Sequence, residues 1–362
     1  MASSTQKPHH HNLPTPYATT AAPPPTPSTS TDTRPTPTLD ALSHLLHRLP
    51  PTLSLSLPTR RSSTPPLISL TDPTPPLLSA ATQLGYFHLT HHHPIPGPST
   101  ESAAVSLFNL PQDQKQLIFP NNWPFGYDDD DVSAGNESFC LDPNELSGLD
   151  SGSDSGCLYE FGREMERIGL KVVEELGRAV GFENPARDEM CSQLWISDTD
   201  GMDRPGRVYP YVVGLHCQLR GCGKYSLWAD SGWVNVSGRV DSVLVTLGDI
   251  AQVWSNGKFK KVRGRPVPMS LEDDNKLSSR YITMSLLITL PLESTVSPLL
   301  PGPAINNGID EQENDEESHD ISTNLMITGE ERQFRSFSFE DYAWRVYHEH
   351  LLLKDPLIRY RV

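Results

Sequence analysis

The fold is limited above all by a series of short strand-like runs in the second half of the chain. Strand composition recurs in residues 193–196, 212–219, 225–230, 233–236, 243–247, 251–254 and 281–290. Turn signals separate these runs, for example Asp230-Ser231-Gly232 and Ser255-Asn256-Gly257. Many short strands at this spacing are typical of an all-β barrel or a jelly roll. We therefore predict a mainly β fold with flanking helices.

The first half of the folded region and the end of the chain supply the helices. We predict strands over 67–70 and 86–90, and helices over 75–85, 103–118 with a break at Pro111, 159–180 and 339–347. The stretch 159–180 is the clearest amphipathic helix, because its apolar residues recur at a spacing near 3.6. Residues 122–154 are rich in Gly, Asp and Ser and are predicted to form a loop.

Composition separates the ends and an insertion from this core. Residues 1–64 form a leader rich in Pro, Ser and Thr that is predicted to be disordered, with a short helix over 40–49 as an island. Residues 302–320 carry seven acidic side chains, so 301–330 is predicted to be a solvated acidic loop. The remaining divisions are an α/β region over 65–190, a jelly-roll core over 191–300 and a C-terminal helical segment over 331–362.

Charge and hydropathy exclude several classes of function. The formal net charge of −16 repels nucleic-acid backbones and anionic membranes, so no nucleic-acid or membrane partner is expected. No hydrophobic segment of a secretory signal precedes the core, and five cysteines without zinc-type spacing predict reduced thiols. We expect a cytoplasmic protein, or a plastid protein if the leader is a transit peptide.

Several motifs give the chain a family resemblance. Residues 66–70 (PLISL), 84–91 (LGYFHLTH), 108–111 (FNLP) and 232–236 (GWVNV) carry part of it. The most specific is the signature run, residues 243–262 (VLVTLGDIAQVWSNGKFKKV). In these motifs the chain resembles plant Fe(II)- and 2-oxoglutarate-dependent dioxygenases of the gibberellin-oxidase and isopenicillin-N-synthase type. The resemblance implies a double-stranded β-helix (jelly roll) and a monomer.

The family's iron is held by a facial triad of two histidines and one aspartate. At the position of the second histidine, directly after the signature run, this chain has Gly264. The family's spacing back to its His-x-Asp motif reaches Tyr209-Pro210-Tyr211, and a shorter alignment reaches His216-Cys217-Gln218. Neither offers a carboxylate. We therefore predict no catalytic residue and no metal ligand set, with His216 as a weak candidate for a ligand.

The family's Arg-x-Ser pair, which holds the oxoacid, falls at Arg280-Tyr281-Ile282. Arg280 is therefore the predicted contact for an acid carboxylate, with a structural salt bridge as the other interpretation. The predicted function is a dioxygenase-like protein without iron catalysis, which binds a small carboxylate or plant metabolite in the barrel. No cofactor is expected.

Two alternatives stay open. An active oxidoreductase would need Fe(II) and 2-oxoglutarate, with iron held from unusual positions such as His216 with Asp230 or Asp249. A scaffolding protein would bind a protein partner through its leader or its acidic loop.

Overall fold

A computed structural model describes the parts of the chain that position the candidate site. The described residues are 61–71, 74–90, 96–131, 136–144, 155–182, 185, 189–199, 208–220, 223–239, 241–269, 280–299, 331–349 and 355–362. They all belong to the unit Thr59–Val362, one of two units into which the chain divides. The predicted helix over 40–49 and the predicted acidic loop lie outside the described residues.

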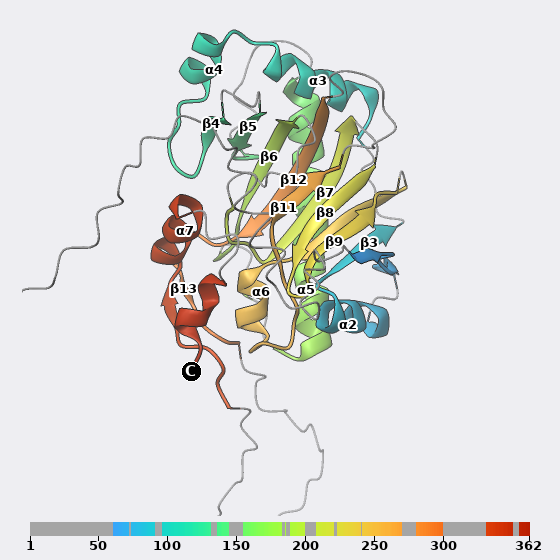
Figure 1. The fold of residues 1–362 in the computed structure, drawn as a ribbon, viewed down its shortest axis with the longest axis vertical. Helices are drawn as coiled ribbons and strands as arrows, with labels where there is room; N and C mark the ends of the chain where they lie inside the picture. Colours follow the sequence, from blue (N-terminus) through green and yellow to red (C-terminus); the bar gives the residue numbers. More distant parts are fainter. Residues whose placement is uncertain are drawn as a thin grey trace, which may run out of the picture. The chain divides into compact units, whose positions relative to one another are not determined.

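The described strands form two main sheets (Figure 1). The eight-stranded sheet has the order β2 (Leu67–Ser69), β3 (Tyr86–Thr90), β10 (Ser242–Leu247), β7 (Val213–Arg220), β12 (Tyr281–Thr289), β6 (Cys191–Thr199), β5 (Asn136–Leu141) and β4 (Gly126–Asp131). The four-stranded sheet has the order β1 (Arg61–Ser63), β9 (Gly232–Ser237), β8 (Lys224–Ala229) and β11 (Val262–Pro268). A short pair, β13 (Thr295–Val296) and β14 (Phe337–Ser338), lies near the C-terminus.

Alternation along the strands places one apolar core between the two sheets. Leu244 of the large sheet packs there with Tyr225, Leu227 and Val262 of the small sheet. Its neighbour Val245 points to the opposite face and joins the larger core under the helices. A period of two residues thus turns one face of the large sheet toward the small sheet and the other toward the helices. This arrangement confirms the predicted double-stranded β-helix.

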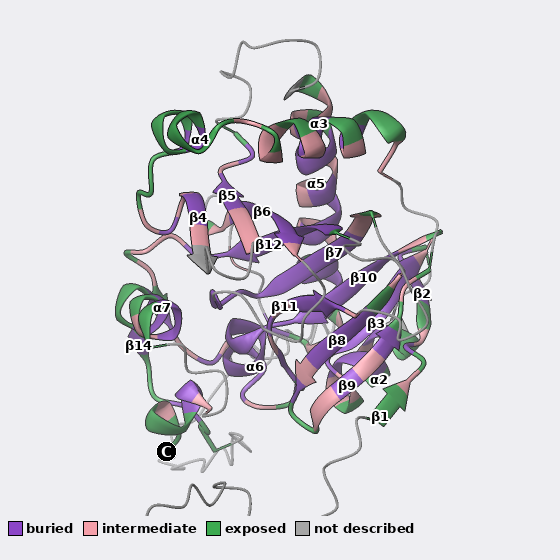
Figure 2. Ribbon diagram, turned by 45° about the horizontal axis from the view of Figure 1, so that its top comes forward, coloured by how far each residue is buried: buried purple, intermediate pink, exposed green. Residues whose placement is uncertain are grey.

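The long helix α5 (Ser155–Val180) covers the outer face of the large sheet (Figure 1). Helices α2 (Thr74–Gln83) and α3 (Pro98–Phe108) pack against α5. The approach of α5 to the sheet is close at Gly169, where a Cβ atom would lie 2.8 Å from Cγ1 of Ile288. Figure 2 shows the result, with buried strands in the middle and the exposed faces of α3 and α4 (Gln112–Ile118) outside.

The C-terminal segment forms α7 (Phe339–His348) and a 3₁₀ helix, η3 (Pro356–Tyr360). Helix α7 begins where predicted, and the hydroxyl of Ser338 caps it by accepting a hydrogen bond from the Asp341 amide. Among the described residues, no helix combines the length and the apolar composition of a membrane span.

Three expectations about local structure are wrong. Residues 251–254 belong to a helix, α6 (Asp249–Trp254), and not to a strand. All six of its residues are buried, so its sequence has no amphipathic pattern to reveal a helix. The predicted loop over 122–154 contains β4 and β5, which form one edge of the large sheet. The predicted leader ends too late, because residues 61–63 are β1, paired in parallel with β9.

Candidate functional site

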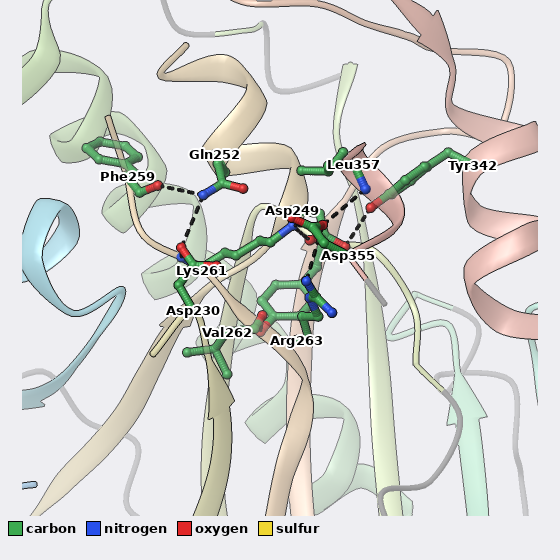
Figure 3. Close-up of polar contacts among 11 residues, drawn as sticks. Asp230, Asp249, Gln252, Phe259, Lys261, Val262, Arg263, Tyr342, Asp355 and Leu357 are labelled. Carbon is green, nitrogen blue, oxygen red and sulfur yellow. Dashed lines mark hydrogen bonds and ion pairs between the residues drawn. The ribbon is translucent and has the colours of Figure 1, made fainter. Parts of the chain in front are cut away.

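The signature run builds the base of the barrel and attaches the C-terminal segment to it. Lys261 has a fully buried side chain, and its Nζ lies 2.8 Å from Oδ1 of Asp249 and 2.7 Å from Oδ1 of Asp355 (Figure 3). The hydroxyl of Tyr342 donates to Oδ2 of Asp249 at 2.8 Å, and Arg263 lies 3.3 Å from Asp355. We call these five residues the base cluster. Burial alone would raise the pKa of Asp355, but Lys261 and then Arg263 hold that pKa below its usual range.

The next part of the signature run holds the chain just before β14. Asn256 adopts a positive φ of 50°, and its side chain donates to the Glu331 carbonyl at 3.0 Å. Its Oδ1 accepts from the Gln333 amide at 2.8 Å. Gln252 donates to Asp230 and to the Phe259 carbonyl, both at 3.2 Å. The residues that carry the family resemblance therefore have structural partners, and the acids Asp230 and Asp249 are both engaged here.

Tyr211 and Gly264, two residues at predicted ligand positions, contact each other through the Tyr211 hydroxyl. The hydroxyl of Tyr211 donates to the carbonyls of Val262 at 2.9 Å and of Gly264 at 3.2 Å. Gly264 has a φ of +65°, and a Cβ atom on it would lie 3.2 Å from Cγ2 of Val208. A phenol and an aliphatic side chain fill the space beside Gly264. The placement of the His-x-Asp motif at Tyr209-Pro210-Tyr211 or at His216-Cys217-Gln218 stays a prediction.

His216 lies on β7 of the large sheet, whereas Gly264 lies on β11 of the small sheet. Its Nδ1 is 2.8 Å from Oγ of Ser285 on β12, and its Nε2 is 2.8 Å from Oγ1 of Thr246 on β10. Burial, and to a smaller extent the charge of Arg265, lowers the pKa of His216 to about 3. The imidazole is therefore neutral at physiological pH, and both of its nitrogens have protein partners.

Arg280 lies just before β12, and its Nε is 2.8 Å from Oδ2 of Asp198. The guanidinium is half exposed. Burial raises the pKa of Asp198, and Arg280 opposes that rise. Arg280 thus forms the salt bridge that was its other predicted role. It is not among the residues that line the cavity described next.

The cation that faces the barrel mouth is Arg265, which the sequence reasoning missed. Its guanidinium lies over the indole ring of Trp195, 4.1 Å from the ring centroid, and donates to Oγ of Ser197 at 2.8 Å. Both partners belong to β6, so Arg265 reaches from the small sheet to the large one. The available signal was its place in the sequence, one residue after Gly264.

A small polar cavity opens beside Arg265. Its volume is about 70 Å³, and hydroxyl groups of Ser197, Thr199, Thr283 and Ser285 line it. Two acids, Asp128 and Glu137, also line it. Glu137 is paired with Lys115 at 2.6 Å. The guanidinium and the hydroxyl groups can together bind a small anion.

Curated proteins with similar sequences include plant gibberellin dioxygenases. The chain is 24% identical over 293 residues to gibberellin 2-beta-dioxygenase 1 of Pisum sativum, covering 73% of this chain and 85% of the relative. It is 23% identical over 306 residues to gibberellin 2-beta-dioxygenase 4 of Arabidopsis thaliana, covering 75% and 85%. No family model matches the chain.

Solved structures show the same fold. The dioxygenase for auxin oxidation from rice superimposes with a TM-score of 0.62 at 18% identity, covering 82% of this chain and 99% of that one. The dioxygenase for auxin oxidation 1 from Arabidopsis thaliana, solved with 2-oxoglutarate, gives 0.54 at 14% identity, covering 64% and 95%. The chain is similar in sequence to gibberellin 2-beta-dioxygenases and shares the fold of solved 2-oxoglutarate dioxygenases. The predicted resemblance is confirmed.

The described residues of this chain do not form the ligand set of the family's iron. Among them, no group of three His, Cys, Asp or Glu side chains is placed to hold a metal ion. Gly264 offers no side chain, the phenol of Tyr211 is hydrogen-bonded, and both nitrogens of His216 are bonded to hydroxyl groups. Iron(II) in a facial triad needs imidazole nitrogen and carboxylate oxygen.

Proposed function

We propose that this dioxygenase-family chain binds a small organic acid at its barrel mouth and does not use iron. One observation carries the proposal. The Tyr211 hydroxyl donates to the Gly264 carbonyl at 3.2 Å. This hydrogen bond within the chain occupies the space between Tyr211 and Gly264, the two predicted ligand positions. Displacing this buried phenol would leave carbonyl oxygens without a partner.

Arg265 supports the choice of an acid as the ligand. It is the one cation among the described residues that line the cavity, and a guanidinium can bind a carboxylate in a bidentate way. The curated relatives are named for gibberellin, and the cavity beside Arg265 is small, with a volume of about 70 Å³. The expectations of a protein partner, a cytoplasmic location and a monomer stay predictions.

The test is an anaerobic titration of purified protein with Fe(II), followed by 2-oxoglutarate, with metal content and thermal unfolding as readouts. A ligand that binds only the folded state raises the melting temperature by mass action. We expect less than one tenth of an iron per chain and no shift with 2-oxoglutarate. One iron per chain, together with stabilisation by 2-oxoglutarate only in the iron form, would overturn the proposal. Loss of that iron in His216→Ala would then establish the active-oxygenase alternative.

A further inference from the structure

A chain of hydrogen bonds crosses the barrel, and its far end fixes its direction. The oxygen of Tyr211 lies 2.9 Å from the Val262 carbonyl and 3.2 Å from the Gly264 carbonyl. A carbonyl oxygen only accepts, so the single phenol proton is directed to these two oxygens. The hydroxyl of Thr246, 2.9 Å away, must therefore donate its proton to the Tyr211 oxygen.

The same argument continues through His216 to the cavity. Because the Thr246 proton is used, Thr246 accepts from Nε2 of His216 at 2.8 Å. The imidazole is neutral, so its proton is on Nε2 and its Nδ1 is an acceptor. The hydroxyl of Ser285 then donates to Nδ1 at 2.8 Å. If Ser285 accepted a hydrogen bond from His216 instead, the direction of every hydrogen bond in the chain would have to change as far as the backbone carbonyls. Those carbonyls have no proton to donate.

The consequence appears at the cavity that Ser285 lines. Its proton is directed into the protein, so Ser285 presents only lone pairs to a ligand. Arg265 lines the same cavity and presents only donors. The site therefore has a cationic donor and a separate, neutral acceptor.

We propose that the barrel mouth is selective for a small hydroxycarboxylate, with the carboxylate on Arg265 and the hydroxyl donating to Ser285. This inference rests on the proposed function and names its ligand class. A ketone or a methylene in place of the hydroxyl leaves the Ser285 acceptor without a donor, and a ketone also places two lone pairs against each other. A buried polar group that loses its partner disfavours binding strongly.

Small acids are the probes that isolate these two contacts. The cavity volume is only about 70 Å³, so we choose acids of three carbons. Lactate, pyruvate and propionate have nearly the same shape and the same carboxylate. They differ at the carbon next to the carboxylate, which carries a hydroxyl donor in lactate, a ketone acceptor in pyruvate and only hydrogen in propionate. This set isolates the contact with Ser285.

The experiment measures the binding of these three acids to the full chain by calorimetry at pH 7. We expect lactate to bind at least tenfold more tightly than pyruvate and propionate. Arg265→Gln should weaken lactate binding at least tenfold, whereas the matched Arg280→Gln should leave it unchanged. Ser285→Ala should remove the preference for lactate. Equal binding of lactate and pyruvate by the unmodified chain would overturn the inference, and so would an effect of Arg280→Gln as large as that of Arg265→Gln.

A spectroscopic readout does not depend on any variant. The ¹⁵N resonances of the His216 ring report which nitrogen carries the proton. We expect the Nε2–H tautomer, and an Nδ1–H tautomer would overturn the inference. Failure here is distinguishable from failure of the proposed function. Equal binding of the three acids without iron would refute the hydroxycarboxylate selectivity alone, whereas loading with iron, or absence of binding by all three acids, would refute the proposed function as well.

Discussion

Replacing His216 with glutamine should change how the stability of the fold depends on pH. Burial lowers the pKa of His216 to about 3 in the folded chain, whereas an unfolded histidine has a pKa near 6.5. As the pH falls below 6.5, the unfolded chain takes up a proton that the folded chain excludes. Stability is therefore lost progressively between pH 6.5 and about pH 3, and is unaffected by this group above pH 7.

The magnitude follows from the two pKa values. Integrating the difference in bound protons between pH 7 and pH 5 gives a loss of about 2 kcal/mol from this one side chain. Glutamine is the matched replacement, because its amide can accept from Ser285 and donate to Thr246 without titrating. His88, whose pKa burial also lowers, is present in both proteins, so its contribution cancels.

The assay is urea unfolding of both proteins at pH 7, 6 and 5. The free energy of unfolding of the unmodified chain should fall by about 2 kcal/mol more than that of His216→Gln over this range. Parallel pH dependences would refute the reasoning. They would mean that His216 is protonated in the folded chain or reaches solvent, and the direction assigned to its hydrogen bonds would fall with it.

Three further substitutions test the remaining contacts by denaturant unfolding. Gly264→Ala should cost about 1–2 kcal/mol, because the φ of +65° is unfavourable for a side chain and the Cβ would press on Val208; no loss would show that this turn is relaxed. Asp355→Asn should cost about 3 kcal/mol, because Lys261 would keep only one carboxylate. The exposed Glu160→Gln is its control, and an equal effect of the two would contradict a role for the base cluster. Arg280→Gln should cost less than about 1 kcal/mol, since its guanidinium is half exposed, and a larger loss would show that Asp198 depends on it.

The barrel could be predicted from the sequence because the signals for its strands and turns each extend over only a few neighbouring residues. Alternating strands and glycine-containing turns are visible within a few residues, and the signature run specifies the base of the barrel. The same local reasoning fails at α6, whose six residues are all buried and have no polar face. It also fails at β4, where acidic residues form an edge strand of the large sheet.

The candidate site was only partly predictable, for a different reason. Gly264 was identified by its place directly after the signature run, and its neighbour Tyr211 by counting. Whether an arginine points into the barrel depends on which face of the sheet its position occupies. A shift of one residue moves the side chain to the opposite face. Arg265 faces the cavity and Arg280 does not, a distinction that spacing along the chain did not resolve. The partnership of Lys261 with Asp355 joins residues far apart in the sequence and needed the folded chain.

The contact between Tyr211 and Gly264 also bears on how this barrel can change by mutation. Introducing histidine at 264 alone would force a side chain onto Val208 at a positive φ, and replacing Tyr211 alone would leave buried carbonyls unpaired. Either single step lowers stability before any ligand set exists. Under the proposed function, a metal site would therefore require coordinated substitutions at both positions, and gradual selection for iron would meet a barrier at its first step.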